Sequence, residues 1–133
     1  MNHNVKLTIV ITISFACAST LPHLKDVTEL APPQKVRFAA QNGTIKISWQ
    51  ASPHESQPQF AGYNLYYAKK SLILAPIKEL PTPIFLEKFQ HEFTLTNLDS
   101  HATYFGHIRS RNRDGDISLP SLPELLIHAP TSF

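Results

Sequence analysis

The segment from Phe93 to Gly115 constrains the fold of this chain more than any other. It places a short alternating strand, a leucine, a tyrosine and a second alternating strand in one fixed order. Tyr104, Ile108 and Ser110 fall on one face of the second strand, as a half-buried antiparallel strand requires. Several such runs separated by turn-forming residues predict an all-β, antiparallel sandwich of about seven strands.

Two upstream segments repeat this alternation at a period of two. The residues that share one face are Ile45, Ile47 and Trp49 in the first segment and Tyr63, Leu65 and Tyr67 in the second. We expect these side chains to form the core, because alternate residues of a strand point to opposite faces of its sheet. The body of the chain shows no comparable helical period, which favours the all-β interpretation.

Together these elements resemble the fibronectin type III family. Modules of that family carry prolines before the first strand, a tryptophan closing the second, a tyrosine-rich third strand, and a leucine followed by a tyrosine before the sixth. The matching residues are Pro32 and Pro33, Trp49, Gly62–Tyr67, Leu98 and Tyr104, with Glu124–Ala129 as the last strand. The resemblance covers about residues 32–130 and implies an immunoglobulin-like fold with Trp49, Leu98 and Tyr104 as structural residues.

The position of Tyr104 carries a physical expectation of its own. A tyrosine at the start of the sixth strand can bury its ring while its hydroxyl bonds a backbone group a few residues upstream. Gly106 stands at an inward position where the family prefers a bulky residue, which indicates a bulge or the close approach of another backbone. Residues 71–89 contain Pro76, Pro81 and Pro83, and we assign no strands there because proline cannot donate to a ladder.

An N-terminal leader precedes this domain. Residues 1–16 combine a short start containing Lys6 with an apolar run too short to span a membrane, as in a secretory signal peptide. Ser14–Cys17 resembles a relaxed bacterial lipobox, which implies cleavage before Cys17 and lipidation of its sulfur. The alternative is ordinary cleavage after Ala18. Residues 17–31 are then expected to be a flexible tether, because they mix serine, threonine, proline and charges.

Localisation and charge follow from these features. We expect an exported protein of the cell envelope, anchored to a membrane through Cys17, or otherwise a periplasmic or secreted one. Cys17 is the single cysteine, so no intramolecular disulfide can form. The 12 basic and 10 acidic side chains become 11 and 10 once Lys6 is removed with the leader, and a nucleic-acid binder would usually be more basic.

A candidate binding face lies on the predicted third and sixth strands. His107, Arg109 and Arg111 should alternate outward on the sixth strand, with Arg113 in the next loop and Tyr66 beside them on the third. Arginines next to an aromatic ring can hold an anionic glycan through bidentate contacts. The alternative is an ordinary solvated sheet face. The following Asp114-Gly115 is interpreted as turn chemistry, with glycine supplying a positive φ.

The sequence contains no pattern typical of catalysis or metal binding. The histidines outside the leader are scattered: His23, His54, His91, His101, His107 and His128. None stands at a recurring metal-ligand spacing, and no Gly-x-Ser-x-Gly motif is present. We therefore expect a non-enzymatic binding or assembly module without cofactor or metal, whose partner is another envelope or extracellular protein. Alternatives are an anionic-glycan-binding module and an accessory subunit of a secreted hydrolase.

Overall fold

The computed structural model describes residues 29–131. The leader, Cys17 and most of the expected tether lie outside the described residues. The elements are β1 (Gln34–Gln41), β2 (Thr44–Gln50), β3 (Phe60–Ala68), the 3-10 turn η2 (Ile77–Glu79), β4 (Ile84–Glu87), β5 (Glu92–Leu95), β6 (Thr103–Asn112) and β7 (Leu125–His128). Within this part of the chain, no helix is long and apolar enough to cross a membrane.

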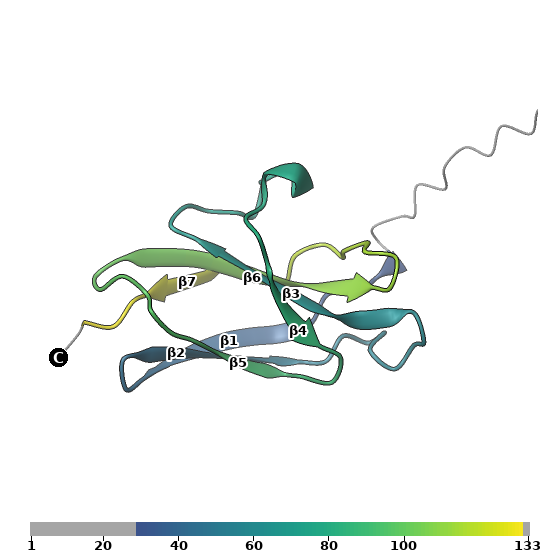
Figure 1. Ribbon diagram of the computed structural model, residues 1–133, viewed down its shortest axis with the longest axis horizontal. Helices are drawn as coiled ribbons and strands as arrows, with labels where there is room; N and C mark the ends of the chain where they lie inside the picture. The colour runs from purple at the N-terminus through teal and green to yellow at the C-terminus, as the bar shows by residue number, and fades with distance from the viewer. Residues whose placement is uncertain (1–28, 132–133) are drawn as a thin grey trace, which may run out of the picture.

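The strands form two antiparallel sheets packed face to face (Figure 1). One sheet has the order β1-β2-β5 and the other the order β4-β3-β6-β7. The central pair of the larger sheet is β3 with β6, in a register that sets Tyr66 opposite His107 and Asn64 opposite Arg109. The predicted all-β sandwich of seven strands is confirmed. The second, third and sixth strands lie where the alternation placed them, and the last strand lies where the family resemblance placed it.

The core lies between the sheets and consists of the residues that alternate inward. Ile45, Ile47, Tyr63, Leu65 and Ile108 are fully buried. Trp49 is also buried, and its ring meets that of Tyr63 edge to face at 5.7 Å between centroids. Edge-to-face packing suits the charge distribution of two aromatic rings, so this pair contributes more than the area it buries.

The turn before β6 has the expected tyrosine hydrogen bond. The backbone N–H of Asp99 donates to the hydroxyl of Tyr104 over 2.9 Å, and Leu98 packs against the core beside it. Gly106 lies where the backbone of β3 approaches β6 closely, as the sequence indicated. A Cβ there would lie 3.1 Å from the backbone oxygen of Tyr66 and 3.6 Å from the Cβ of Tyr67, so the neighbouring strand fills that space.

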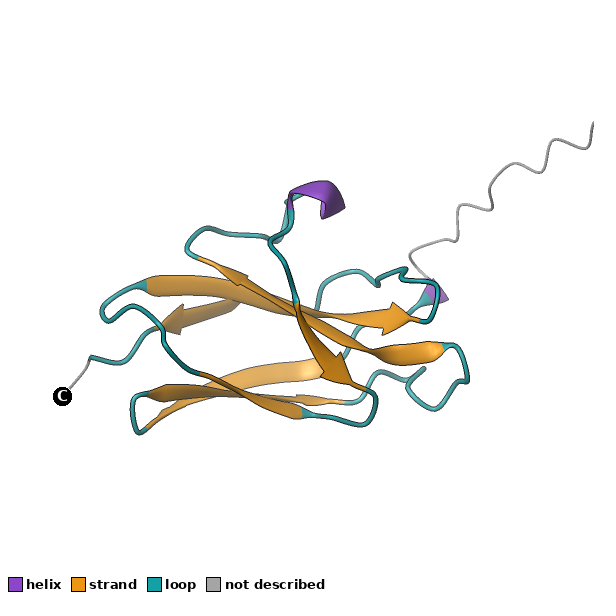
Figure 2. Ribbon diagram, in the orientation of Figure 1, coloured by secondary structure: helices purple, strands orange, loops and turns teal. Residues whose placement is uncertain are grey.

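The proline-rich connection between β3 and β4 contains no strand and only the short 3-10 turn η2 (Figure 2). We call residues 69–83 the cover segment, because they pass over the face of the larger sheet that is turned away from β1, β2 and β5. Leu72 is fully buried there against Tyr66 and Ile117. The prolines keep this backbone out of the sheet ladder, so it is held by side-chain contacts.

Candidate binding surface

Three of the five residues predicted to bind a ligand are buried on the outer face of the four-stranded sheet. The exposed fractions of Tyr66, His107 and Arg109 are 4%, 0% and 4%. Their side chains do point away from the main core, as the alternation predicted. The expectation that they face solvent is wrong, because the cover segment packs Leu72 onto Tyr66 and closes this part of the sheet.

Arg109 and His107 form a buried polar pair. The Nε–H of Arg109 donates to Nε2 of His107 over 3.1 Å, and its Nη1 donates to the backbone oxygen of Ser118 over 3.0 Å. Since Nε2 accepts, His107 is neutral with its proton on Nδ1, and Nδ1 has no partner among the described residues. Burial, helped by the Arg109 charge, lowers the pKa of His107 to about 4.

Arg111 and Arg113 follow this buried pair toward the end of β6, and Arg111 is linked to Tyr66 through Asn64, whose Nδ2 donates to the Tyr66 hydroxyl over 3.1 Å. Nη1 of Arg111 donates to Oδ1 of Asn64 over 2.7 Å, and its guanidinium lies 4.8 Å from the ring centroid of Phe85. Arg113 is exposed, and its backbone N–H donates to the backbone oxygen of Gln59 over 2.9 Å. The five predicted residues therefore form no single exposed face.

Glu124 holds the cover segment in place. One carboxylate oxygen accepts the backbone N–H of Leu72 over 2.8 Å, and the other accepts the hydroxyl of Ser71 over 2.7 Å. Glu124 stands directly before β7, so these bonds tie the β3–β4 connection to the segment leading into β7. The two connections therefore lie side by side on the outer side of the sheet.

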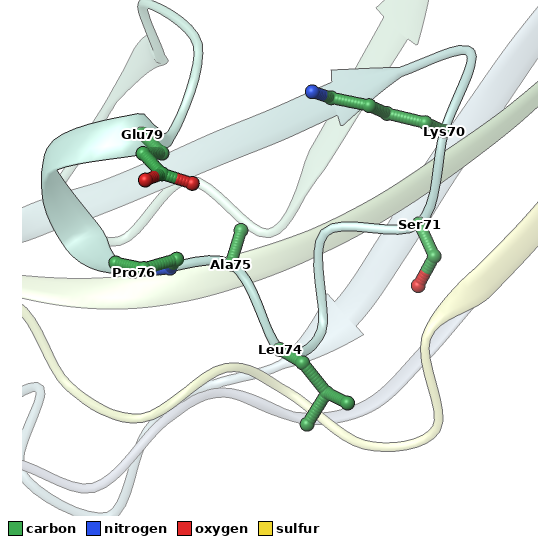
Figure 3. Close-up of a pocket in the computed structure, with 6 residues that line it drawn as sticks. All are labelled: Lys70, Ser71, Leu74, Ala75, Pro76 and Glu79. Carbon is green, nitrogen blue, oxygen red and sulfur yellow. The ribbon is translucent and has the colours of Figure 1, made fainter.

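On the side away from the buried Tyr66, His107 and Arg109, the cover segment exposes apolar side chains to solvent. Leu74 is 92% exposed and Ile77 is 53% exposed. A pocket of about 360 Å³ is lined by Lys70, Ser71, Leu74, Ala75, Pro76 and Glu79. Figure 3 shows Lys70 and Glu79 reaching toward each other from opposite sides of this pocket. The leucines at 119 and 122, in the adjoining connection, are 52% and 71% exposed.

A second exposed group, missed by sequence reasoning, surrounds the turn between β4 and β5. Phe85 and Phe89 are each 66% exposed, and Nζ of Lys88 lies 5.3 Å from the ring centroid of Phe89. Phe89 has a φ of 70°, a backbone conformation that bulky side chains rarely adopt. The available signal was a pair of phenylalanines on either side of Lys88 in a short segment.

A buried network that the sequence also concealed fixes the loop between β2 and β3. The hydroxyl of Tyr63 donates to the carboxylate of Glu55, and Nε2 of His91 lies 2.7 Å from the same carboxylate oxygen. The backbone N–H of Ser52 donates to the Tyr63 hydroxyl over 3.0 Å. Burial, together with the Glu55 bond, raises the pKa of Tyr63. His91 is 36 residues from Glu55 in sequence, so only the fold adds it to this network.

The remaining predicted features lie as follows. Gly115 has a φ of 87°, and the Asn112 side chain accepts the backbone N–H of both Asp114 and Asp116, so the turn interpretation is confirmed. Within residues 29–131, no group of three or more histidine, cysteine, aspartate or glutamate side chains is placed to hold a metal ion.

Comparison with known proteins identifies the domain. The family model described as "Fibronectin type III domain" matches residues 31–124. No curated protein matches the sequence significantly.

Similar solved structures include the third fibronectin III domain of the human KIAA0343 protein, with 20% identity, a TM-score of 0.59, and coverage of 77% of this chain and 86% of that one. A Fn3-like protein from Clostridium thermocellum is 19% identical, with a TM-score of 0.53 and coverage of 77% and 98%. The Clostridium perfringens spore cortex lytic enzyme SleM is 12% identical, with a TM-score of 0.51 and coverage of 74% of this chain and 28% of the enzyme. Similarity at these identities shows a shared fold, and together with the family match it places this chain in the fibronectin type III family.

Proposed function

We propose that this protein is a non-enzymatic, exported and lipid-anchored module of the bacterial cell envelope that binds another protein. A fibronectin type III domain is a general binding scaffold, and function lies in the surface that each member carries. The observation that supports this role is the apolar surface of the cover segment. Leu74 and Ile77 are 92% and 53% exposed there.

Several properties of this surface suit a protein partner. Exposed apolar surface bordered by polar residues is typical of protein–protein interaction sites. Glu124 holds the cover segment beside the connection that carries Leu119 and Leu122, so four exposed apolar residues belong to two segments fixed together. Lys70 and Glu79 border the pocket (Figure 3) and supply the polar rim that surrounds the apolar centre of a typical interface.

The anchoring part of the proposal rests on the leader and Cys17. A diacylglyceryl group and further acylation at one cysteine would hold the protein at a membrane far more firmly than a single chain. The test is the intact mass of the mature protein in membrane and soluble fractions, with a Cys17→Ala variant as control. A chain that starts at Cys17 with added acyl mass supports anchoring. A bare chain that starts at Ser19 contradicts it.

The binding part is tested by cross-linking in cells with a tagged full-length chain. A double variant, Leu74→Ser with Ile77→Ser, removes the two exposed apolar side chains of the cover segment. Phe38→Ser is the matched control, because Phe38 is partly exposed on the opposite sheet. We expect one partner to be captured by the wild type and the control and lost in the double variant. Equal capture by all three would contradict this surface as the binding site.

The two alternatives make different predictions. An anionic-glycan site using Tyr66, Arg109 and Arg111 would give salt-sensitive binding to sulfated or phosphorylated glycans, lost in an Arg109→Ala, Arg111→Ala variant. The burial of Tyr66 and Arg109 disfavours it, since a glycan would have to displace the cover segment. An accessory subunit of a hydrolase would co-purify with a catalytic chain. Hydrolase activity in the pure protein would overturn the non-enzymatic role.

A further inference from the structure

The chain enters the described domain at one end of the sandwich and is firmly held there. The backbone oxygen of Ala31 accepts the hydroxyls of Ser52 and Ser110, each over 2.6 Å. The backbone N–H of Ala31 donates to Nδ1 of His54 over 3.1 Å. Figure 1 shows this point on the right-hand side, together with the β2–β3, β4–β5 and β6–β7 connections. Any membrane anchor that precedes Ala31 therefore pulls on this end of the domain.

An exposed phenylalanine lies on the same end. The backbone N–H of Gln90 donates to the oxygen of Glu87 over 3.1 Å, which closes a turn with Phe89 at its third position. That position has a φ of 70° and normally selects glycine or asparagine. Phe89 thus adopts a backbone conformation that bulky residues disfavour. Its large apolar side chain is also exposed, although apolar surface is more stable when buried. Such a combination points to a role at the surface.

Two cations flank the loop next to this turn. Nζ of Lys88 lies 5.3 Å from the Phe89 ring centroid and donates to the backbone oxygen of Gln57 over 3.0 Å. Arg113, exposed on the β6–β7 connection, bonds the same loop through its backbone at Gln59. The loop between β2 and β3 is thus bordered by a lysine and an arginine. Acidic residues also lie at this end and include Glu29, Glu55, Glu87, Asp114 and Asp116. The attraction of this end to anions is therefore confined to the surroundings of Lys88 and Arg113 and is short in range.

We propose that this end of the domain rests on the lipid bilayer to which the chain is anchored. Phe89 inserts its ring at the interface, while Lys88 and Arg113 meet the phosphates of anionic headgroups. The inference rests on the proposed anchoring at Cys17. From Cys17 to Ala31 the chain has 31 minus 17, or 14, steps. They span about 50 Å at most, so a weak contact forms readily at a high effective concentration.

This orientation has a consequence for the cover segment. The cover segment lies over the outer face of the four-stranded sheet (Figure 2). This face forms a side of the domain, whereas the chain enters at an end. With that end on the membrane, Leu74 and Ile77 stay accessible to a protein partner. The two surfaces therefore serve separate contacts.

The experiment anchors the protein artificially and measures which end meets the lipid. All the described strands lie between Gln34 and His128, so a chain that begins at Cys17 contains the whole described fold. Cys17 is the single cysteine and can be coupled to a maleimide lipid in vesicles that contain anionic phospholipid. A tryptophan reporter is introduced by Phe89→Trp or, as the matched control, by Leu74→Trp. Trp49 supplies the same background in both.

Quenching by brominated phospholipid is the readout. We expect the reporter at position 89 to be quenched several-fold more than the reporter at 74, with less quenching after Lys88→Glu and Arg113→Glu. Lys70→Glu with Lys78→Glu makes the same charge change on the cover segment and should leave the signal at 89 intact. Melting curves check that each variant folds.

The outcomes separate this proposal from the proposed anchoring. Equal quenching at positions 89 and 74, or equal effects of the two charge-reversal pairs, would overturn the membrane contact even if Cys17 is lipidated in cells. A bare chain that starts at Ser19 in cells would contradict the proposed anchoring while leaving the vesicle result unchanged.

Discussion

Arg109 donates a hydrogen bond from its Nε to Nε2 of His107 over 3.1 Å, although both side chains are almost wholly buried. A buried arginine is usually paired with a carboxylate. Here its bonds go to a neutral imidazole and to the backbone oxygen of Ser118. The arrangement works only while His107 stays neutral, because a protonated imidazole offers no lone pair to Arg109. The outer face of the sheet is therefore sensitive to acid.

The first prediction concerns stability against pH. The pKa of His107 is about 4 in the folded protein, compared with 6.5 in the unfolded chain, so below 6.5 the unfolded chain binds a proton that the folded protein does not. The contribution of His107 to the free energy of unfolding should be fully present above pH 6.5. It should be lost as the pH is lowered toward 4, which reduces the free energy of unfolding by about 2 to 3 kcal/mol.

Denaturant titrations at several pH values test this. His107→Gln retains an oxygen acceptor for Arg109 but cannot titrate, so it should flatten the dependence between pH 4 and 6.5. His101, which is exposed, provides the control His101→Gln. An unchanged slope in His107→Gln would rule out the neutral buried histidine.

The second prediction concerns the carboxylate that holds the cover segment. Glu124→Ala removes the acceptors of the Leu72 N–H and the Ser71 hydroxyl, and should lower the free energy of unfolding by about 1 to 3 kcal/mol. Amide hydrogen exchange at Leu72 should accelerate well beyond exchange in the core strands. Glu124→Gln keeps one oxygen and should have an intermediate effect. Unaltered protection of Leu72 in Glu124→Ala would contradict the assigned contact.

The third prediction concerns the tyrosine before β6. Tyr104→Phe removes the acceptor of the Asp99 N–H and should lower the free energy of unfolding by about 1 kcal/mol. Tyr67→Phe is the control, since the described residues give the Tyr67 hydroxyl no hydrogen bond and the ring remains packed near Tyr104. Thermal melting of both variants would show whether the loss is confined to Tyr104.

The fourth prediction concerns the core. Trp49→Ala should lower the free energy of unfolding by about 3 to 5 kcal/mol, a large part of the stability of a domain this size. Trp49 is 6% exposed and packs edge to face on Tyr63, so its loss leaves a cavity between the sheets. An unchanged melting temperature would mean that the indole does not support the core.

The fifth prediction separates stability from membrane contact at Phe89. Phe89→Gly relieves a side chain from a φ of 70° and should raise the free energy of unfolding by about 1 kcal/mol. The same change removes the ring proposed to meet the bilayer. The Phe89→Gly variant could be more stable and yet make less contact with the bilayer of vesicles that contain anionic phospholipid. That result would show that the strain at this turn is retained for function. A less stable variant would show instead that the ring supports the fold.

Much of the fold could be predicted from periodicity. Ile45, Ile47 and Trp49 alternate on β2, and Tyr104, Ile108 and Ser110 share one face of β6, so both strands and their inward faces were evident. The hydroxyl bond of Tyr104 followed from its position beside the turn. These features depend on residues close together in sequence, where the geometry of a strand leaves few choices.

The binding surface could not be predicted in the same way. Alternation correctly sent Tyr66, His107 and Arg109 to the outer face, but it carries no information about what covers that face. The cover segment has no periodicity, and its position depends on Glu124 bonding Ser71 and Leu72 more than fifty residues away along the chain, over 2.7 and 2.8 Å. A contact of that kind exists only once both connections have been brought together by the sheet.

The sequence by itself thus determined the sandwich, its core and its tyrosine hydrogen bond, because local alternation and turn chemistry are sufficient for each. Only the tertiary structure decided which side chains meet solvent. It buried the predicted His107 and Arg109 and exposed Leu74 and Phe89, because exposure depends on packing between segments distant in sequence. It also decided that Phe89 lies at the end where the chain enters the domain, since the antiparallel order of the strands sets which connections share an end.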